Sequence, residues 1–133
     1  MTNHITATIE FDYKGNRLSP SAILDLDQLM QQHGTIPPLH QMLAKLNDID
    51  SYSYEYEMMQ AEDIQFTNAS GWVTNFVQND YFDKTSFEQY WHEQQLLEQL
   101  ALELKQQLNI DDIQQHPKLK QIILSAYQLG KKA

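Results

Sequence analysis

The sequence contains no cysteine among its 133 residues. Cysteine supplies disulfides, thiol nucleophiles and thiolate metal ligands, so its absence excludes all three. Glycine is also scarce, with four residues, and none belongs to a G-x-x-x-x-G-K, G-x-G-x-x-G or G-x-S-x-G motif. The chain therefore lacks the familiar signatures of nucleotide-binding loops and of serine hydrolases, and we expect no cofactor.

Long apolar runs are missing as well. No stretch reaches the roughly 18 consecutive apolar residues that a membrane-spanning helix needs, and the first four residues lack the basic and apolar regions of a secretory signal. We therefore expect a cytoplasmic protein. A hydrophobic content of 41% is enough for one real core, so we expect a single globular domain over residues 1–133.

Basic residues are few, with nine Lys and Arg against 18 Asp and Glu, a net charge of −9. Residues 118–133 hold four lysines and no acid, so residues 1–117 carry five bases against eighteen acids, a net charge of −13. A field of that sign repels phosphates, and we expect neither direct nucleic-acid binding nor membrane binding. The basic C-terminal end at 118–133 could contact an anion, but its simpler role is to complement a helix dipole.

The longest periodic stretch runs from Thr85 to Leu108 and predicts an amphipathic helix. Thr85 and Glu88 have the spacing of a capping box at its start. Its apolar residues recur at steps of three and four, and they are Phe87, Tyr90, Trp91, Leu97, Leu100, Ala101, Leu104 and Leu108.

Two shorter helices are predicted by the same spacing. One covers residues 39–46, and the other starts near Pro117 and is expected to end at Gly130. The apolar stripe of the last helix consists of Leu119, Ile122, Ile123, Ala126 and Tyr127.

Residues 20–33 fit two interpretations. A helix from Pro20 to His33 is favoured, because Pro20 suits the first helical position and Gly34 suits the position just past a helix end. In the alternative, residues 21–26 form a strand and a shorter helix starts at an Asp25 cap.

Residues 4–13 alternate between apolar and polar side chains, which predicts a half-buried strand. The residues Lys14, Gly15 and Asn16 are expected to end it in a turn. The apolar side of this predicted strand consists of Ile5, Ala7, Ile9, Phe11 and Tyr13.

Residues 51–59 also alternate, which predicts a second strand whose tyrosine rings cover the core. Its two sides are Tyr52, Tyr54, Tyr56 and Met58 on one, and Ser53, Glu55 and Glu57 on the other. Residues 64–67 predict a short third strand, followed by a turn over residues 68–71. Residues 72–77 fit either a helix or a strand, and the preceding turn favours a hairpin strand.

The predicted order of elements is therefore β-α-α-β-β-(β)-α-α. Such an order indicates an α+β fold, in which a small antiparallel sheet of three or four strands is packed on one face by helices.

A group of carboxylates is the strongest candidate site. If the strands over residues 4–13 and 51–59 are neighbours, one exposed sheet face carries Glu10, Asp12, Glu55 and Glu57. Like charges a few ångströms apart raise one another's pKa, and such a cluster can bind a divalent cation or act as an acid/base pair. An ordinary solvated face is the commoner reason for this pattern.

The five histidines do not predict a metal site, because no two are spaced by four residues on one helix. His33 lies on the apolar side of the favoured helix and is interpreted as a packed side chain. His92 follows Glu88 by four residues, which predicts a helix-surface contact.

Two functional classes fit these observations. The first is a non-enzymatic interaction module that forms a homodimer through its long and C-terminal helices, or that binds a basic protein through the acidic face. The alternative is a small metal-assisted or acid/base enzyme that uses the carboxylate cluster. The sequence favours the first class, since it contains no catalytic signature.

Overall fold

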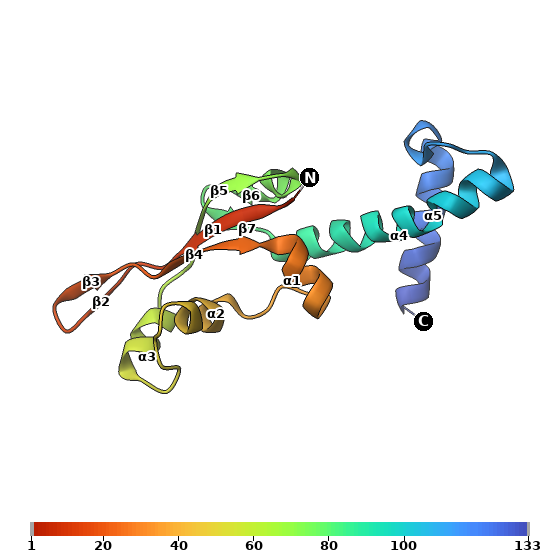
Figure 1. Ribbon diagram of the computed structural model, residues 1–133. Coiled ribbons are helices and arrows are strands. Elements are labelled where there is room, and N and C mark those ends of the chain that lie inside the picture. The colour runs from red at the N-terminus through yellow and green to blue at the C-terminus, as the bar shows by residue number, and fades with distance from the viewer. Residues whose placement is uncertain (1, 133) are drawn as a thin grey trace. The chain divides into compact units, whose positions relative to one another are not determined.

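The computed structural model describes residues 2–132 and divides the chain into two compact units, Met1–Glu88 and Gln89–Ala133 (Figure 1). The first unit contains all the strands found in this described part, together with three helices. A fourth helix starts in the first unit and continues into the second, where a fifth helix follows. Small antiparallel sheets and segregated helices make this an α+β fold, which confirms the predicted class.

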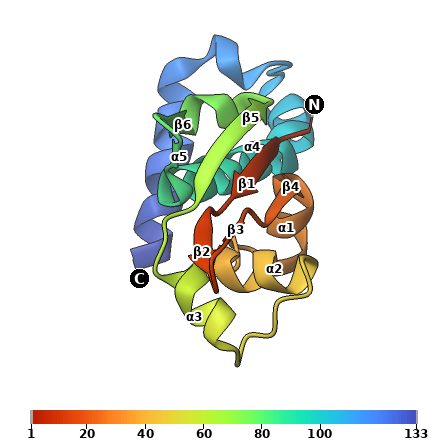
Figure 2. The same ribbon diagram turned by 90° about the vertical axis from the view of Figure 1, so that its left-hand side faces the viewer.

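A three-stranded antiparallel sheet forms the centre of the first unit, in the order β4-β1-β5 (Figure 2). The strands are β1 (His4–Thr8), β4 (Ser21–Asp25) and β5 (Gln65–Ser70). Along β1, Ile5 and Ala7 are fully buried, while His4, Thr6 and Thr8 are partly exposed. The predicted alternation is therefore confirmed in this strand.

The register between β1 and β5 shifts between His4 and Thr6, so the pairing contains a bulge. Asn68 lies on the bulged strand with a φ of 52°, a left-handed conformation that Asn tolerates better than most residues. Strand β5 continues to Ser70, so the turn predicted over residues 68–71 begins later than expected.

A tight hairpin follows β1, formed by β2 (Phe11–Tyr13) and β3 (Asn16–Leu18). The two residues between the strands, Lys14 and Gly15, have φ values of 52° and 78°. Two consecutive left-handed residues match the twist of the strands that they join. The turn predicted at this place is confirmed.

The helix predicted from Pro20 to His33 was wrong, and the alternative was correct. Residues 21–25 form β4, which pairs antiparallel with β1 and places Leu24 opposite Ile5. Both side chains are buried. The pairing with β1 outweighed the local helix signal, because a strand in this position satisfies the backbone of β1 and covers its side chains.

Helix α1 (Leu26–His33) starts where the alternative placed it. The Oδ1 atom of Asp25 accepts a hydrogen bond of 3.1 Å from the backbone N–H of Gln28. The helix ends at Gly34, whose φ of 72° gives the left-handed cap. Helix α2 (Leu39–Leu46) matches its prediction.

The strand predicted over residues 51–59 was wrong, because this segment contains helix α3 (Tyr54–Gln60). The Oγ atom of Ser53 caps the helix by accepting a 3.1 Å hydrogen bond from the backbone N–H of Tyr56. Tyr56 and Met59, three residues apart, are both buried. An alternating sequence can also satisfy a helical period. The cap and the burial of these two side chains stabilise the helix here.

The strand predicted over residues 72–77 was also wrong. Trp72–Phe76 form a 3₁₀ helix, η1, and the rings of Trp72 and Phe76 contact each other edge to face at 5.9 Å. Strands β6 (Val77–Gln78) and β7 (Tyr81–Phe82) follow as a short hairpin.

Helix α4 (Lys84–Leu108) confirms the long amphipathic helix, but the predicted capping box is absent. The backbone N–H of Ser86 donates to Oδ1 of Asp83 at 3.2 Å, so Asp83 caps the first turn. Hydrogen bonds from the Ser86 side chain and backbone hold the pKa of Asp83 below its ordinary value. Glu88 instead accepts hydrogen bonds of 2.6 Å from the Thr35 hydroxyl and from the backbone N–H of Ile36.

A buried asparagine connects three segments of the first unit. The Oδ1 atom of Asn3 accepts a 2.9 Å hydrogen bond from the backbone N–H of Val73, and its Nδ2 atom donates to Asp27 at 3.0 Å. Gly71 lies directly against it, since a Cβ atom there would be 2.6 Å from the Asn3 Oδ1 atom. Asn3 therefore connects the segment before β1 to α1 and to η1.

The second unit consists of α4 from Gln89 onward, the short 3₁₀ helix η2 (Ile113–Gln115) and α5 (Pro117–Lys132). Helix α5 passes through Gly130, so the predicted end at that residue was wrong. Nothing lies within 4 Å of a Cβ atom placed on Gly130. Within residues 2–132, none of the helices has the length and apolar content needed to cross a bilayer.

Candidate interaction surfaces

The four acidic residues predicted to share one sheet face lie on two different elements. Glu10 and Asp12 belong to the chain that enters and forms β2, whereas Glu55 and Glu57 occupy the first turn of α3. Helix α3 contacts β2, but it is not a strand beside β1. The geometry assumed for the acidic face was therefore wrong, and binding by these residues stays a prediction.

Glu10 and Asp12 are both paired with one arginine. The Nη2 atom of Arg17 lies 3.1 Å from Glu10 Oε2, and its Nη1 atom lies 3.3 Å from Asp12 Oδ2. The hydrogen bond to Glu10, followed by that to Asp12, raises the pKa of Arg17. All three side chains are solvent-exposed, so this cluster resembles an ordinary surface ion-pair network on the β2–β3 hairpin.

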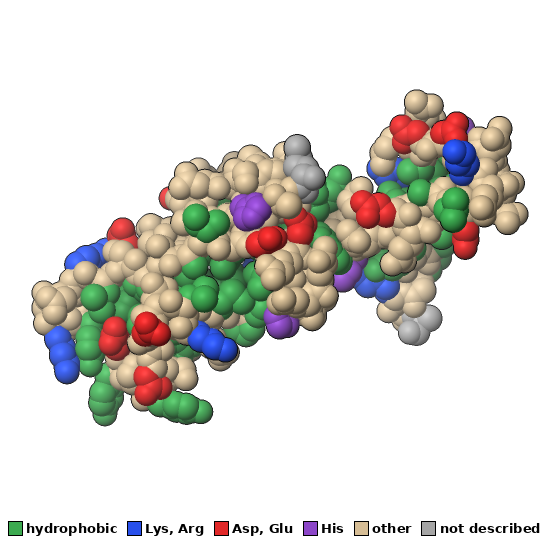
Figure 3. Space-filling view, in the orientation of Figure 1, with side chains coloured by type: hydrophobic (Ala, Val, Ile, Leu, Met, Phe, Trp, Pro, Cys, Tyr) green, Lys and Arg blue, Asp and Glu red, His purple; other side chains and the backbone are tan. Residues whose placement is uncertain are grey.

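Of the three tyrosines that were expected to cover the core, Tyr56 is buried, whereas the two at and before the start of α3 are exposed. Tyr52 and Tyr54 are 96% and 75% exposed. Tyr54 and Met58 are four residues apart and lie on the outer side of the helix, flanked by Glu55 and Glu57. We name Tyr52, Tyr54, Glu55, Glu57 and Met58 the α3 face. Figure 3 shows hydrophobic and acidic side chains gathered over the end of the first unit that carries α3.

A cleft of about 550 Å³ lies elsewhere in the first unit. Its walls come from the starts of α2 and α4, the chain entering β5 and the β6–β7 hairpin. His40 lies in this cleft, where its Nε2 atom is 2.8 Å from the carbonyl oxygen of Glu62. The acidic residues of the lining are Asp63, Asp80 and Asp83. Sequence periodicity gave no signal for this cleft, because its walls are distant in the chain.

No set of three or more His, Asp or Glu side chains suited to a metal ion occurs between residues 2 and 132. His33, interpreted as packed, is exposed in the last turn of α1. Glu88 accepts hydrogen bonds from residues 35 and 36, and its contact with His92 stays a prediction.

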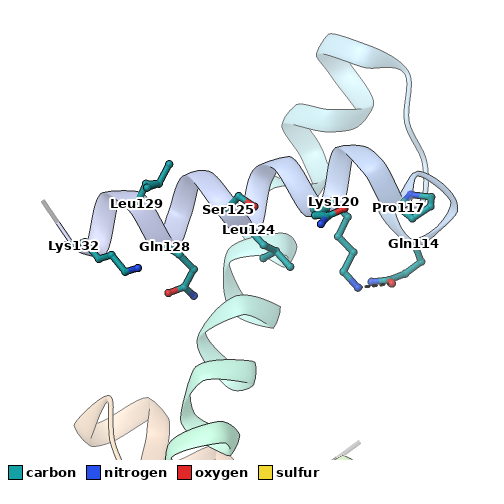
Figure 4. A pocket seen from close by; sticks show the side chains of 9 residues that line it. Gln114, Pro117, Lys120, Leu124, Ser125, Gln128, Leu129 and Lys132 are labelled. Atoms are coloured by element: carbon teal, nitrogen blue, oxygen red, sulfur yellow. Dashed lines mark hydrogen bonds between the residues drawn. The ribbon is translucent and has the colours of Figure 1, made fainter.

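The second unit is marked by apolar side chains that are not covered. Helices α4 and α5 cross steeply (Figure 4), and Gln128 donates a 3.2 Å hydrogen bond to Glu93 across the crossing. A groove of about 300 Å³ lies between them, lined mainly by leucines and Ile123. No residue of α5 is buried over its described length.

The outer side of α5 carries an apolar stripe at helical spacing. Ile122 and Leu129 are 64% and 70% exposed, with Ser125 and Ala126 between them. We name these four residues the α5 stripe. Ser125 and Leu129 also line an open groove of about 650 Å³ along this helix (Figure 4). Ile122 was predicted to belong to the packed stripe of the last helix. The prediction overlooked that α5 carries apolar residues on two sides.

The two helices of this unit differ in charge. Helix α5 contains Lys118, Lys120, Lys131 and Lys132 and no acid. Residues 89–108 of α4 contain three glutamates and one lysine. Glu98 and Glu103 lie near Leu102 in the sequence, and Leu102 is 64% exposed. The unit therefore presents an acidic helix and a basic helix, each with exposed apolar side chains.

Comparison with protein-family models, with curated proteins and with solved structures found no match to this chain.

Proposed function

We propose that this chain is a non-enzymatic interaction module that forms a homodimer through its second unit, residues 89–132. The observation that carries the proposal is the α5 stripe. A helix of sixteen residues is about 24 Å long, and an amphipathic helix of that length is normally stabilised by burying its apolar side. Exposed apolar patches of this kind are typical of protein interfaces.

Charge complementarity supports a second copy as the occupant. The basic α5 of one copy can lie against the acidic α4 of the other, and a two-fold axis makes the reverse contact identical. The exposed Leu102 lies between Glu98 and Glu103 along the sequence of α4. It offers an apolar contact for the α5 stripe, with carboxylates nearby for its lysines. Both helices of each copy then cover part of their exposed leucine side chains.

The overall charge supports a protein partner over nucleic acid, because a net charge of −9 repels phosphates. The absence of cysteine agrees with the cytoplasm, where we expect the module to act.

The first test is the molar mass in solution. We expect a dimer by size-exclusion chromatography with light scattering, and the Leu129→Glu variant to weaken it by more than about tenfold, equal to about 1.4 kcal/mol. Leu46→Glu is a matched control, because Leu46 is 60% exposed in the first unit and also lies at a helix end. A wild-type monomer at high concentration, or equal weakening by both variants, would contradict the proposal.

The second test concerns the pairing of helices. The Glu98→Lys/Glu103→Lys variant makes both helices basic, and the Lys118→Glu/Lys120→Glu/Lys132→Glu variant makes both acidic, since it leaves α5 with three glutamates and one lysine. We expect each variant alone to be monomeric at a concentration where the wild type is dimeric. An equimolar mixture should restore a dimer, because opposite charges then face each other at both contacts. A dimer of the first variant alone would show that α5 of one copy does not contact α4 of the other.

A further inference from the structure

We propose that the α3 face binds a basic segment of a partner protein, with arginine or lysine side chains stacked on Tyr52 and Tyr54 and paired with Glu55 and Glu57. This site lies in the first unit and is independent of the proposed dimer contact. Its occupant is a peptide segment rich in arginine or lysine.

The exposed rings are the first observation. The tyrosine rings of Tyr52 and Tyr54 are among the largest side chains on the surface of the first unit, and nothing in that unit covers them. Leaving two aromatic rings and part of Met58 in water forgoes the burial that such side chains usually provide. Aromatic and methionine side chains are enriched at interfaces.

The backbone that carries these rings is fixed. The backbone N–H of Tyr52 donates to Asp50 Oδ1 at 3.0 Å, and the Ser53 hydroxyl donates to the carbonyl oxygen of Asp50 at 2.6 Å. Ser53 also caps α3, and the buried Tyr56 anchors the helix. The two exposed tyrosines therefore lie on either side of a hydrogen-bonded cap, which lowers the ordering entropy that binding must overcome.

Charge determines which partner fits this surface. Residues 46–63 contain six acidic residues and no Lys, Arg or His. An uncharged apolar partner would bury some of these carboxylates without compensation, which is costly. A guanidinium or ammonium group satisfies both features, because it is attracted to the face of a tyrosine ring and forms ion pairs with carboxylates.

The experiment measures the binding of a fluorescently labelled arginine-rich peptide to the full chain by anisotropy. We expect binding that weakens with salt, and a loss of about tenfold in the Tyr52→Ser/Tyr54→Ser variant, because both rings that would stack on the cations are removed. The Tyr52→Phe/Tyr54→Phe variant keeps the rings and should bind like the wild type. Tyr81→Ser removes another exposed tyrosine of the first unit and should also bind normally.

A matched pair of variants tests the charge requirement. The Glu55→Gln/Glu57→Gln variant should bind the peptide about tenfold more weakly, while Asp111→Asn/Asp112→Asn removes the same charge from an exposed turn, keeps the acceptor for the Gln114 N–H, and should have little effect. Equal losses in both variants, or unchanged binding after removal of the tyrosine rings, would overturn the proposal. If the tyrosine variant were monomeric at a concentration where the wild type is dimeric, the occupant would be a second copy of this chain. That result would also overturn the proposal.

Discussion

The two units of this chain use their apolar side chains in different ways. The first unit has thirteen acids and four Lys and Arg, a net charge of −9, and it contains most of the buried hydrophobic side chains, from Ile5 to Phe87. The second unit has five acids and five bases, so its net charge is zero. Its helix α5 buries no residue. The first unit has a core of its own, whereas the second resembles half of an interface.

This difference predicts opposite responses to the same small substitution. Gly71 has a φ of 88°, and a Cβ atom there would lie 2.6 Å from Asn3 Oδ1 and 2.6 Å from the carbonyl oxygen of Thr2. We expect Gly71→Ala to destabilise the first unit by about 2–4 kcal/mol, from backbone strain and overpacking. Urea unfolding followed by circular dichroism measures the change.

Gly130→Ala is the control in the second unit. Gly130 lies in a helix with open space around it, so we expect a gain of about 0.5–1 kcal/mol in helix stability. A destabilised Gly130→Ala variant, or a tolerated Gly71→Ala variant, would mean that the two units do not differ in packing as described.

The buried Asn3 in the first unit provides a further test of how tightly that unit is packed. Asn3→Ala removes the acceptor of the Val73 N–H and a donor to Asp27, and it leaves a buried N–H unsatisfied. We expect a loss of about 2–3 kcal/mol in the free energy of unfolding. Asn75 is an exposed asparagine on η1, and Asn75→Ala should change stability by less than about 0.5 kcal/mol. Equal effects of the two variants would show that the Asn3 hydrogen bonds do not stabilise the fold.

The smallest expected effect depends on pH. Asp83 has a lowered pKa because the side chain and backbone of Ser86 donate hydrogen bonds to its carboxylate. A lowered pKa in the folded state means that ionised Asp83 stabilises the protein above its unfolded pKa, and that this stability is lost as the pH falls through the folded pKa. The wild type should therefore lose more stability in acid than Asp83→Asn does. Parallel curves of unfolding free energy against pH would contradict this.

Sequence reasoning succeeded where one local pattern had one structural solution. The alternation around Ile5 and Ala7, the turn at Lys14 and the long stripe of α4 each fit a single period or turn type. It failed where a segment satisfied two periods. Residues 51–59 alternate, yet Tyr56 and Met59 also share a helix face, and the cap formed by Ser53 could not be distinguished from a polar strand residue.

The candidate sites were less predictable than the fold. Glu55 and Glu57 were selected by charge, and the structure places them beside exposed tyrosines that had been assigned to the core. The α5 stripe was hidden because an apolar helical face is usually a buried one. Exposure is a property of the whole arrangement, so the pattern of one segment does not reveal it.

The sequence by itself determined the net charge, the segments able to bury one side and the longest helix. Tertiary structure decided that residues 21–25 pair with β1 instead of continuing a helix, that Glu88 accepts hydrogen bonds from residues 35 and 36, and that no residue of α5 is buried. The physical reason is that hydrogen bonds and burial between distant segments provide more free energy than the small differences in local propensity that a sequence pattern reports.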